Sequence, residues 1–235
     1  MPKCSLGKSS LIPAVALLSV FSLSILSGAQ TKAPASPTAP APTTAVIETT
    51  VGNFNCTLFP DKAPIGVANF IGLATGTKDW VDPKTHQKKH GVPLYDGTIF
   101  HRVIPNFMIQ GGDPAGNGSG DPGYKFVNET SSDLLFDQPG RLAYANAGPD
   151  TNGSQFFITE IAYPSLNGGY TIFGQCDDAS VTLVKQIARM GRDSNDRPYN
   201  PPVIKHITIS GPGAPKTAAK ASTTAKSSKT PAKSN

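Results

Sequence analysis

The sequence predicts a mainly β domain in its middle part, a closed antiparallel barrel or a sandwich that carries two helices. Two observations lead to this fold class. Short β-like runs separated by Gly, Pro, Asn and Asp fill most of residues 46–210, and only two segments in this region have helical periodicity. The region contains no internal repeat and no linker, so 46–210 is interpreted as one domain.

The first 29 residues have the pattern of a secretory signal peptide. Lys3 and Lys8 precede an uncharged apolar run at 11–26, and the small residues Ser27 and Ala29 follow it. Cleavage after Ala29 is therefore expected, with export to a periplasm or to the extracellular space. The apolar run is short for a membrane span of about 20 residues, and a retained anchor is the alternative.

Low-complexity segments flank the predicted domain. Residues 30–45 are rich in Pro, Ala and Thr, and an extended spacer is expected there. Residues 211–235 are rich in Lys, Ala and Ser and are expected to be disordered. The five lysines of this tail would either bind an anionic surface weakly or only keep the chain soluble.

The net charge of +5 comes from the two ends of the chain. Residues 1–45 carry three lysines, the tail carries five, and neither has an acidic residue. The middle therefore keeps 13 of the 21 basic side chains and all 16 acidic ones, a net charge of −3. A nucleic-acid partner is not expected, since the basic residues lie mostly outside the predicted fold.

The strands and helices follow from local patterns. Two runs at 45–50 and 53–58 flank Val51-Gly52 as in a hairpin. Further strands are expected at 99–104, 107–110, 141–145, 155–159, 170–175 and 203–210. A first helix begins at Pro64 and ends before Gly76, with apolar residues at Val67, Phe70, Ile71 and Ala74. A second has Ser180 as its N-cap, an apolar stripe, and Gly191 beyond its end; the stripe is Leu183, Ile187 and Met190.

Common catalytic and metal-binding patterns are missing. Ser154 does not lie in a Gly-x-Ser-x-Gly motif. His86 and His90 have the spacing of zinc ligands, but Gln87 replaces the glutamate of a metalloprotease and two lysines would repel a cation. The glycines of 111–120 lack the Gly-Lys-Ser/Thr ending of a phosphate-binding loop, so a tight, solvent-facing loop is expected. No metal and no cofactor is predicted.

Two cysteines remain after removal of the signal peptide. Cys56 and Cys176 lie in strand-like segments and would meet an oxidising compartment. They are either bonded to each other or separate core residues, because a disulfide requires Cα atoms within about 7 Å.

Three motifs resemble the cyclophilin-type peptidyl-prolyl cis-trans isomerases, of the bacterial, exported kind. They are FHRVIPNFMIQGGD at 100–113, YANAGPDTNGSQFFI at 144–158 and LNGGYTIFG at 166–174. The resemblance covers nearly all of 46–210. It implies a closed eight-stranded antiparallel β-barrel capped by two α-helices, which agrees with the strands and helices expected above. It also implies a monomer that needs no cofactor.

The resemblance also implies the site residues. Arg102 matches the catalytic arginine of the family; its alternative role is a structural salt bridge. The proline pocket is matched by Phe107, Met108, Phe157 and Leu166, and the peptide-binding positions by Gln110, Ala145, Asn146 and Gln155. Strand alternation places Gln155 and Phe157 on one face and Arg102 on one face with Phe100 and Ile104.

Three features depart from familiar members of the family. Ser165 stands where eukaryotic members carry a tryptophan, and Tyr170, still able to face the proline pocket, stands where they carry a histidine. Loss of the indole predicts weak inhibition by cyclosporin. The segment 77–93, which contains Trp80, is longer than in compact members and is expected to be a surface loop, with or without a role in substrate contact.

The expected function is acceleration of proline-limited folding of exported proteins. The partners would be unfolded or flexible polypeptides that contain proline, because uncatalysed isomerisation takes tens of seconds or more. The alternative is a proline-peptide binding module or holdase chaperone in which turnover is incidental.

Overall fold

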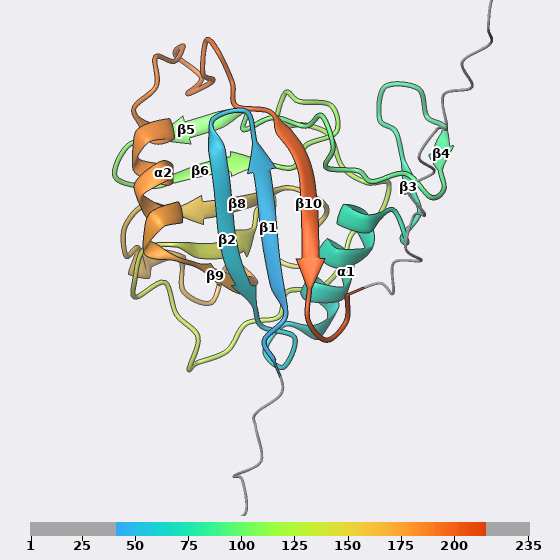
Figure 1. The fold of residues 1–235 in the computed structure, drawn as a ribbon, viewed down its shortest axis with the longest axis horizontal. Helices are drawn as coiled ribbons and strands as arrows, with labels where there is room; N and C mark the ends of the chain where they lie inside the picture. Colours follow the sequence, from blue (N-terminus) through green and yellow to red (C-terminus); the bar gives the residue numbers. More distant parts are fainter. Residues whose placement is uncertain (1–40, 215–235) are drawn as a thin grey trace, which may run out of the picture. The chain divides into compact units, whose positions relative to one another are not determined.

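The computed structural model describes residues 41–214 (Figure 1). The predicted signal peptide, the first part of the predicted spacer and the tail beyond Ala214 lie outside the described residues. Among the described residues, no helix is long and apolar enough to cross a membrane.

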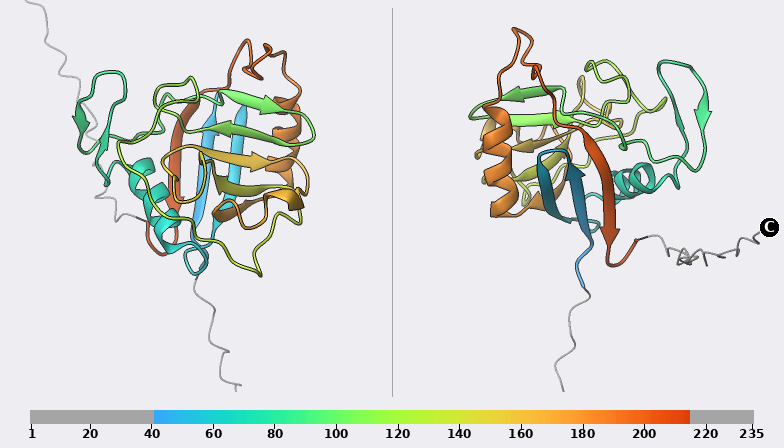
Figure 2. Two further views of the ribbon diagram at one scale, coloured as in Figure 1. Left: turned by 180° about the vertical axis from the view of Figure 1, so that it is seen from behind. Right: turned by 45° about the horizontal axis from the view of Figure 1, so that its top comes forward.

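One antiparallel sheet of eight strands dominates the fold, as the sequence predicted. Its strand order is β10-β1-β2-β9-β7-β8-β6-β5, so the first and last strands in sequence lie side by side (Figures 1 and 2). The strands are β1 (Thr44–Thr49), β2 (Gly52–Leu58), β5 (Arg102–Ile104), β6 (Met108–Gly111), β7 (Arg141–Tyr144), β8 (Phe156–Thr159), β9 (Ile172–Cys176) and β10 (Ile204–Ser210). The predicted hairpin at Val51-Gly52 joins β1 to β2.

The prediction of a closed barrel overstated the closure of the sheet. The edge strands β5 and β10 do not pair with each other along their length. The chain just before each of them makes one isolated bridge, between Ile99 and Val203, and Phe100 donates from its backbone N to Pro202 O at 3.0 Å. Regular pairing does not extend further because β5 has only three residues. The sheet is therefore a curled half-barrel.

Two α-helices lie at opposite ends of the curled sheet (Figures 1 and 2). Helix α1 (Pro64–Thr75) is confirmed from its first proline to Gly76, whose φ of 72° ends the helix in the left-handed region. Helix α2 (Asp178–Ala188) begins earlier than predicted, because Asp177 and not Ser180 is the N-cap. The Asp177 carboxylate accepts a hydrogen bond from Ser180 N at 2.8 Å. The Ser180 hydroxyl instead accepts one from Asn55 N, so it ties α2 to β2.

Aromatic side chains fill the inside of the curled sheet. Phe70 of α1 lies 5.1 to 5.7 Å, between ring centroids, from Tyr95, Phe156 and Phe173. Phe54 packs edge-on against Phe100 at 5.6 Å. All of these side chains are buried, and edge-to-face pairs add to the stability gained from burial.

A second, smaller apolar cluster lies on the opposite, outer face of the sheet. Its buried members are Met108, Phe136, Ala143, Phe157 and Ile172. Successive strand residues point to opposite faces. Neighbours in sequence therefore lie on opposite faces: Phe156 belongs to the inner core, whereas Phe157 belongs to the outer cluster.

The long segment 77–93 is more than a surface loop. It forms a ribbon of two short strands, β3 (Trp80–Val81) and β4 (Lys88–Lys89), which stands away from the sheet (Figures 1 and 2). Trp80 belongs to the inner core and donates from Nε1 to Val92 O at 2.8 Å. The apolar indole therefore anchors the base of the ribbon, which corrects the prediction.

Cys56 and Cys176 form a disulfide, which settles the alternative that the sequence left open. They are opposite each other on β2 and β9, and their Sγ atoms are bonded.

Candidate active site

The strand register places one residue from each of four strands in a row on the outer face. Arg102 of β5 is opposite Gln110 of β6, Gln110 is opposite Phe157 of β8, and Phe157 is opposite Ala143 of β7. Because alternate residues share a face, Ile104 and Met108 form a second pair one step along. The three predicted site residues in the first row are thus neighbours, although they come from distant parts of the sequence.

A cavity of about 200 Å³ opens above this row. It is lined by nine of the ten predicted site residues: Arg102, Phe107, Met108, Gln110, Ala145, Asn146, Phe157, Leu166 and Tyr170. Gln155 is the tenth and lines a neighbouring cavity instead. Arg102 is the one charged residue in the lining of the first cavity, whose floor is apolar.

Aromatic rings form the floor and one wall of this cavity. Phe157 is stacked on Phe136 with centroids 5.8 Å apart, and it meets Tyr170 edge-on at 5.6 Å. Phe107 packs against Tyr163 at 4.5 Å, a contact that the sequence did not indicate. A rigid floor of this kind suits a small, flat aliphatic ring such as that of proline.

The Arg102 side chain lies at the rim of the cavity and is 43% exposed. Its Nε lies 3.9 Å from an Asp196 carboxylate oxygen, and its guanidinium makes no hydrogen bond with any of the described residues. At this distance the Asp196 carboxylate makes no hydrogen bond with the guanidinium, whose terminal amino groups have no partner among the described residues.

The prediction that Phe100 shares a face with Arg102 was wrong. Phe100 is fully buried in the inner core, where it packs against Phe54 and Phe156. Regular strand geometry begins only at Arg102, so alternation does not extend back to Phe100. Within β5, Val103 points into the core, while Arg102 and Ile104 face outward as expected.

His101, next to Arg102 in sequence, is buried and neutral at neutral pH. Burial lowers the pKa of its imidazole below the ordinary value of 6.5. Neither ring nitrogen has a hydrogen-bond partner among the described residues. His101 thus adds no positive charge beside Arg102.

A second cavity of about 310 Å³ adjoins the first, and its largely polar lining includes the amides of Gln110, Asn146 and Gln155. The two cavities share Gln110, Ala145 and Asn146. Gln110 donates from Nε2 to Gln155 Oε1 at 2.9 Å. Asn146 donates from Nδ2 to Gly169 O at 2.9 Å, which fixes the loop between the two cavities. Polar groups thus surround the route by which an extended peptide would leave the apolar cavity.

The glycine-rich segment 111–120 has a role that the sequence prediction missed. It was expected to be a tight, solvent-facing loop, yet part of it forms a wall of the second cavity. Gln155 donates from Nε2 to Gly118 O at 3.0 Å and to Gly120 O at 2.8 Å. The buried Asp113 carboxylate accepts from Asn117 N at 2.9 Å and so shapes the loop. The acidic residue among the glycines was the available signal.

The described residues contain no cluster of metal-ligand side chains. Within residues 41–214, no three His, Cys, Asp or Glu side chains come together as metal ligands. His90, one of the two histidines with zinc-like spacing, lies with its Nδ1 2.6 Å from an oxygen of Asp79.

Comparisons with a family model and with curated relatives indicate the same family. The model of the family "Cyclophilin type peptidyl-prolyl cis-trans isomerase/CLD" matches residues 44–209. Peptidyl-prolyl cis-trans isomerase A of Mycobacterium tuberculosis is 53% identical over 171 residues, which are 72% of this chain and 93% of the relative. Peptidyl-prolyl cis-trans isomerase B of Streptomyces anulatus is 48% identical over 167 residues, 70% of this chain and 95% of the relative.

Solved structures agree with the sequence comparisons. A cyclophilin-type isomerase of Cryptosporidium parvum superposes with a TM-score of 0.62 at 33% identity, covering 73% of this chain and 99% of that one. A second structure of that protein, determined in the presence of the dipeptide Ala-Pro, gives a TM-score of 0.60 at 34% identity and covers 72% and 99%.

Proposed function

We propose that this chain, which belongs to the cyclophilin-type peptidyl-prolyl cis-trans isomerases, uses that activity to speed the proline-limited folding of exported proteins. The proposal assigns catalysis to Arg102 and substrate binding to the two cavities. The observation that carries it is the position of one guanidinium, with free terminal amino groups, at the rim of an apolar cavity sized for a small ring.

The role of Arg102 follows from the chemistry of the X-Pro bond. The amide resists rotation because the nitrogen lone pair is shared with the carbonyl group, which gives a barrier of about 18–20 kcal/mol. A hydrogen bond donated by Arg102 to the prolyl nitrogen would hold the lone pair on nitrogen as the bond twists. Such a bond, absent in the planar amide, stabilises only the transition state and therefore accelerates the reaction.

Arg102 alone does not account for an efficient enzyme. A turnover of about 10³ per second requires a barrier of roughly 13 kcal/mol, so the barrier must fall by about 6 kcal/mol. One preorganised donor supplies about 3–4 kcal/mol. The apolar floor that Phe157 and Met108 form would supply the remaining reduction of the barrier, by removing water from the proline ring and by orienting the ring.

The second, largely polar cavity would hold the peptide on one side of the proline. Gln110 and Asn146 lie between the two cavities, where a peptide backbone would cross. If the ring and one flanking segment are fixed, rotation is confined to the other side of the amide. The structure of the Cryptosporidium relative determined in the presence of the dipeptide Ala-Pro supports an X-Pro ligand for this cavity.

Export is supported by two independent features of the chain. Residues 1–29 have the signal-peptide pattern. The Cys56–Cys176 disulfide is of a kind that persists in oxidising compartments and is rare in a reducing cytosol. Proteins that fold after export in the same compartment are therefore the proposed clients.

Substitution of Arg102 tests the catalytic assignment. Arg102→Ala is expected to lower kcat/KM for a proline peptide by about 10² to 10³, while the Kd of the peptide changes little. Arg102→Lys should also lose activity, because a lysine lacks the planar fork of donors. Lys62→Ala is the matched control, since Lys62 is similarly exposed and ion-paired to Asp133, and neither residue lines either cavity. Retained kcat/KM in Arg102→Ala would refute the assignment.

A refolding experiment separates the isomerase role from a binding role. A reporter protein whose refolding is limited by a prolyl bond is refolded with wild-type protein and with Arg102→Ala. Under the proposal only the wild type accelerates refolding. Equal protection of the reporter by both proteins, together with full rescue of a cell that lacks this protein by Arg102→Ala, would instead favour the holdase function.

A further inference from the structure

The loop between α2 and β10 folds back onto the strand that carries Arg102. This loop appears in orange above α2 in Figure 1. Val103 donates from its backbone N to Asp196 O at 2.9 Å. Because β5 is the edge strand of the sheet, the loop supplies the partner that a further strand would otherwise provide. The loop is thereby placed directly beside Arg102.

The loop is held in one conformation by its own hydrogen bonds. Asp193 Oδ1 accepts from the backbone N of Asn195 at 2.8 Å and of Arg197 at 3.0 Å. Asp196 has a φ of 61°, in the left-handed region, which aspartate and asparagine tolerate better than most residues. An uncommon backbone conformation next to a reactive group suggests a functional constraint.

The Asp196 carboxylate lies between two arginines. Its Oδ2 is 3.9 Å from Arg102 Nε, and its Oδ1 is 3.1 Å from Arg192 Nε. The carboxylate thus approaches Arg102 from the Nε side. The two terminal amino groups of Arg102 point away from this ion pair and stay available to a substrate.

We propose that Asp196 is a positioning residue, which fixes the Arg102 guanidinium so that its terminal amino groups face the proline-binding cavity. The inference rests on the proposed catalytic role of Arg102. A long, half-exposed arginine samples several rotamers, and a charge held behind its Nε favours one of them. Asp196 itself does not line the cavity.

Two physical effects of Asp196 predict opposite results for its removal. If Asp196 acted only through its negative charge, its loss would strengthen the field of Arg102 at the prolyl nitrogen and raise kcat. If it acts by orientation, its loss lowers kcat. The direction of the change therefore distinguishes positioning from field effects.

Asp196→Asn removes the charge and keeps both the size and the tolerance for a left-handed backbone. We expect kcat to fall about three- to fivefold, the upper part of the range of an exposed ion pair, with KM unchanged within a factor of two. Catalysed exchange of a proline peptide, followed by NMR, gives both quantities. The Nε–Hε resonance of Arg102 should also shift and broaden in this variant.

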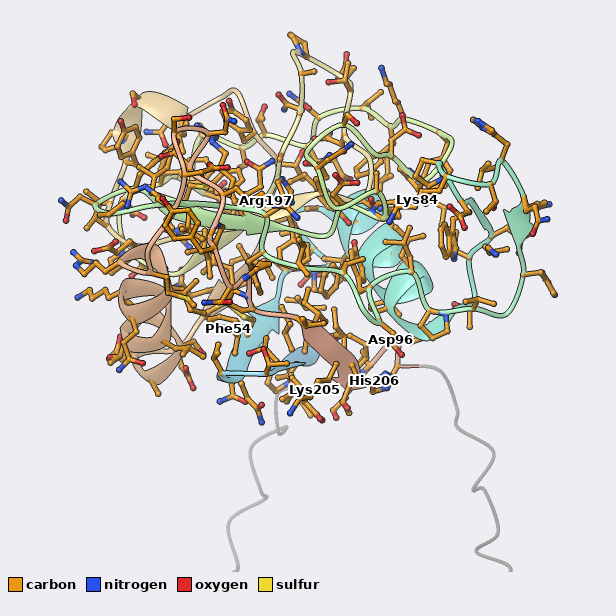
Figure 3. All side chains as sticks on the ribbon, turned by 90° about the horizontal axis from the view of Figure 1, so that it is seen from above. Phe54, Lys84, Asp96, Arg197, Lys205 and His206 are labelled. Carbon is orange, nitrogen blue, oxygen red and sulfur yellow. A yellow bond between two sulfur atoms is a disulfide. The ribbon has the colours of Figure 1, made fainter. Side chains whose placement is uncertain are left out.

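Asp96→Asn is the matched control. Asp96 is 37% exposed against 33% for Asp196, and it is also ion-paired, to His206. Figure 3 shows Asp96 beside His206, and Asp96 does not line the proline-binding cavity. This variant is expected to leave kcat, KM and the Arg102 resonance unchanged.

A double variant makes the test specific to Arg102. A lysine at position 102 has no guanidinium for Asp196 to orient. In an Arg102→Lys background, Asp196→Asn should therefore cause no further loss of kcat. Unchanged or raised kcat in Asp196→Asn, or an equal fractional loss in both backgrounds, would overturn the inference. If Arg102→Ala is inactive while Asp196→Asn is fully active, only the positioning role fails. If Arg102→Ala is fully active, the proposed function of Arg102 fails first.

Discussion

Reduction of the Cys56–Cys176 disulfide is expected to lower the free energy of unfolding by about 3–5 kcal/mol. The two cysteines are 120 residues apart in sequence, so the bond closes a long loop in the unfolded chain. The loop-entropy relation gives about 5 kcal/mol at 25 °C for a loop of this length, and removal of native disulfides typically costs 2–5 kcal/mol. Both figures are a large share of the 5–15 kcal/mol that is usual for a domain.

Urea unfolding of oxidised and reduced protein measures this change. The midpoint should move to a lower urea concentration on reduction. The double variant Cys56→Ala/Cys176→Ala is the control, since a reducing agent should leave its midpoint unchanged. Where both forms are folded, kcat/KM should be equal, because neither cysteine lines the proline-binding cavity. Equal midpoints for the oxidised and reduced wild type would refute the reasoning.

Two further predictions concern a helix cap and the rim of the cavity. The hydrogen bond with Ser180 lowers the pKa of Asp177 below its ordinary value of 3.8. The ionised carboxylate therefore stabilises the fold above that pH, and this contribution is lost as the pH falls through the lowered pKa. Asp177→Ala should therefore cost about 1 kcal/mol of unfolding free energy at pH 7 and less below about pH 4; a cost that grows in acid would contradict this. Ser165 lies exposed in the short 3₁₀ helix η1 (Pro164–Leu166), next to the cavity residue Leu166. Ser165→Trp should tighten cyclosporin binding at least roughly tenfold by calorimetry, with Ser165→Ala unchanged, because an indole adds apolar contact and a donor; wild-type affinity equal to that of the Trp variant would refute this.

The parts of the site that lie on regular strands could be predicted from the sequence. Once β5, β6 and β8 are in register, alternation alone places Arg102, Gln110 and Phe157 on one face. The site residues themselves were predicted from the resemblance to the family motifs. Alternation was applied only to Gln155 with Phe157 and to Arg102 with Phe100 and Ile104. Helix α1 was predictable for a similar reason, because Pro64 and Gly76 mark its two ends locally.

The errors arose where a distant contact overrides the local pattern. The Phe100 side chain lies in the inner core and not on the face that alternation along β5 predicts, because Phe100 precedes the regular strand and packs against Phe54. Ser180 looked like an N-cap, yet its hydroxyl contacts β2 and Asp177 caps the helix instead. Trp80 was placed in a surface loop, although its large apolar ring is buried in the inner core. Each outcome depends on a partner far away in sequence.

The same distinction separates the site from the residues that adjust it. Arg102 and most of the cavity floor lie on paired strands and within the motifs that resemble the family. Asp196 is held beside Arg102 by the hydrogen bond that its carbonyl accepts from Val103 N. The two residues are far apart in sequence, and Asp196 belongs to no helix or strand. A change in this loop would leave the strand pattern intact and still alter the orientation of the guanidinium. Loop contacts of this kind are therefore where isomerases with the same cavity are expected to differ in rate.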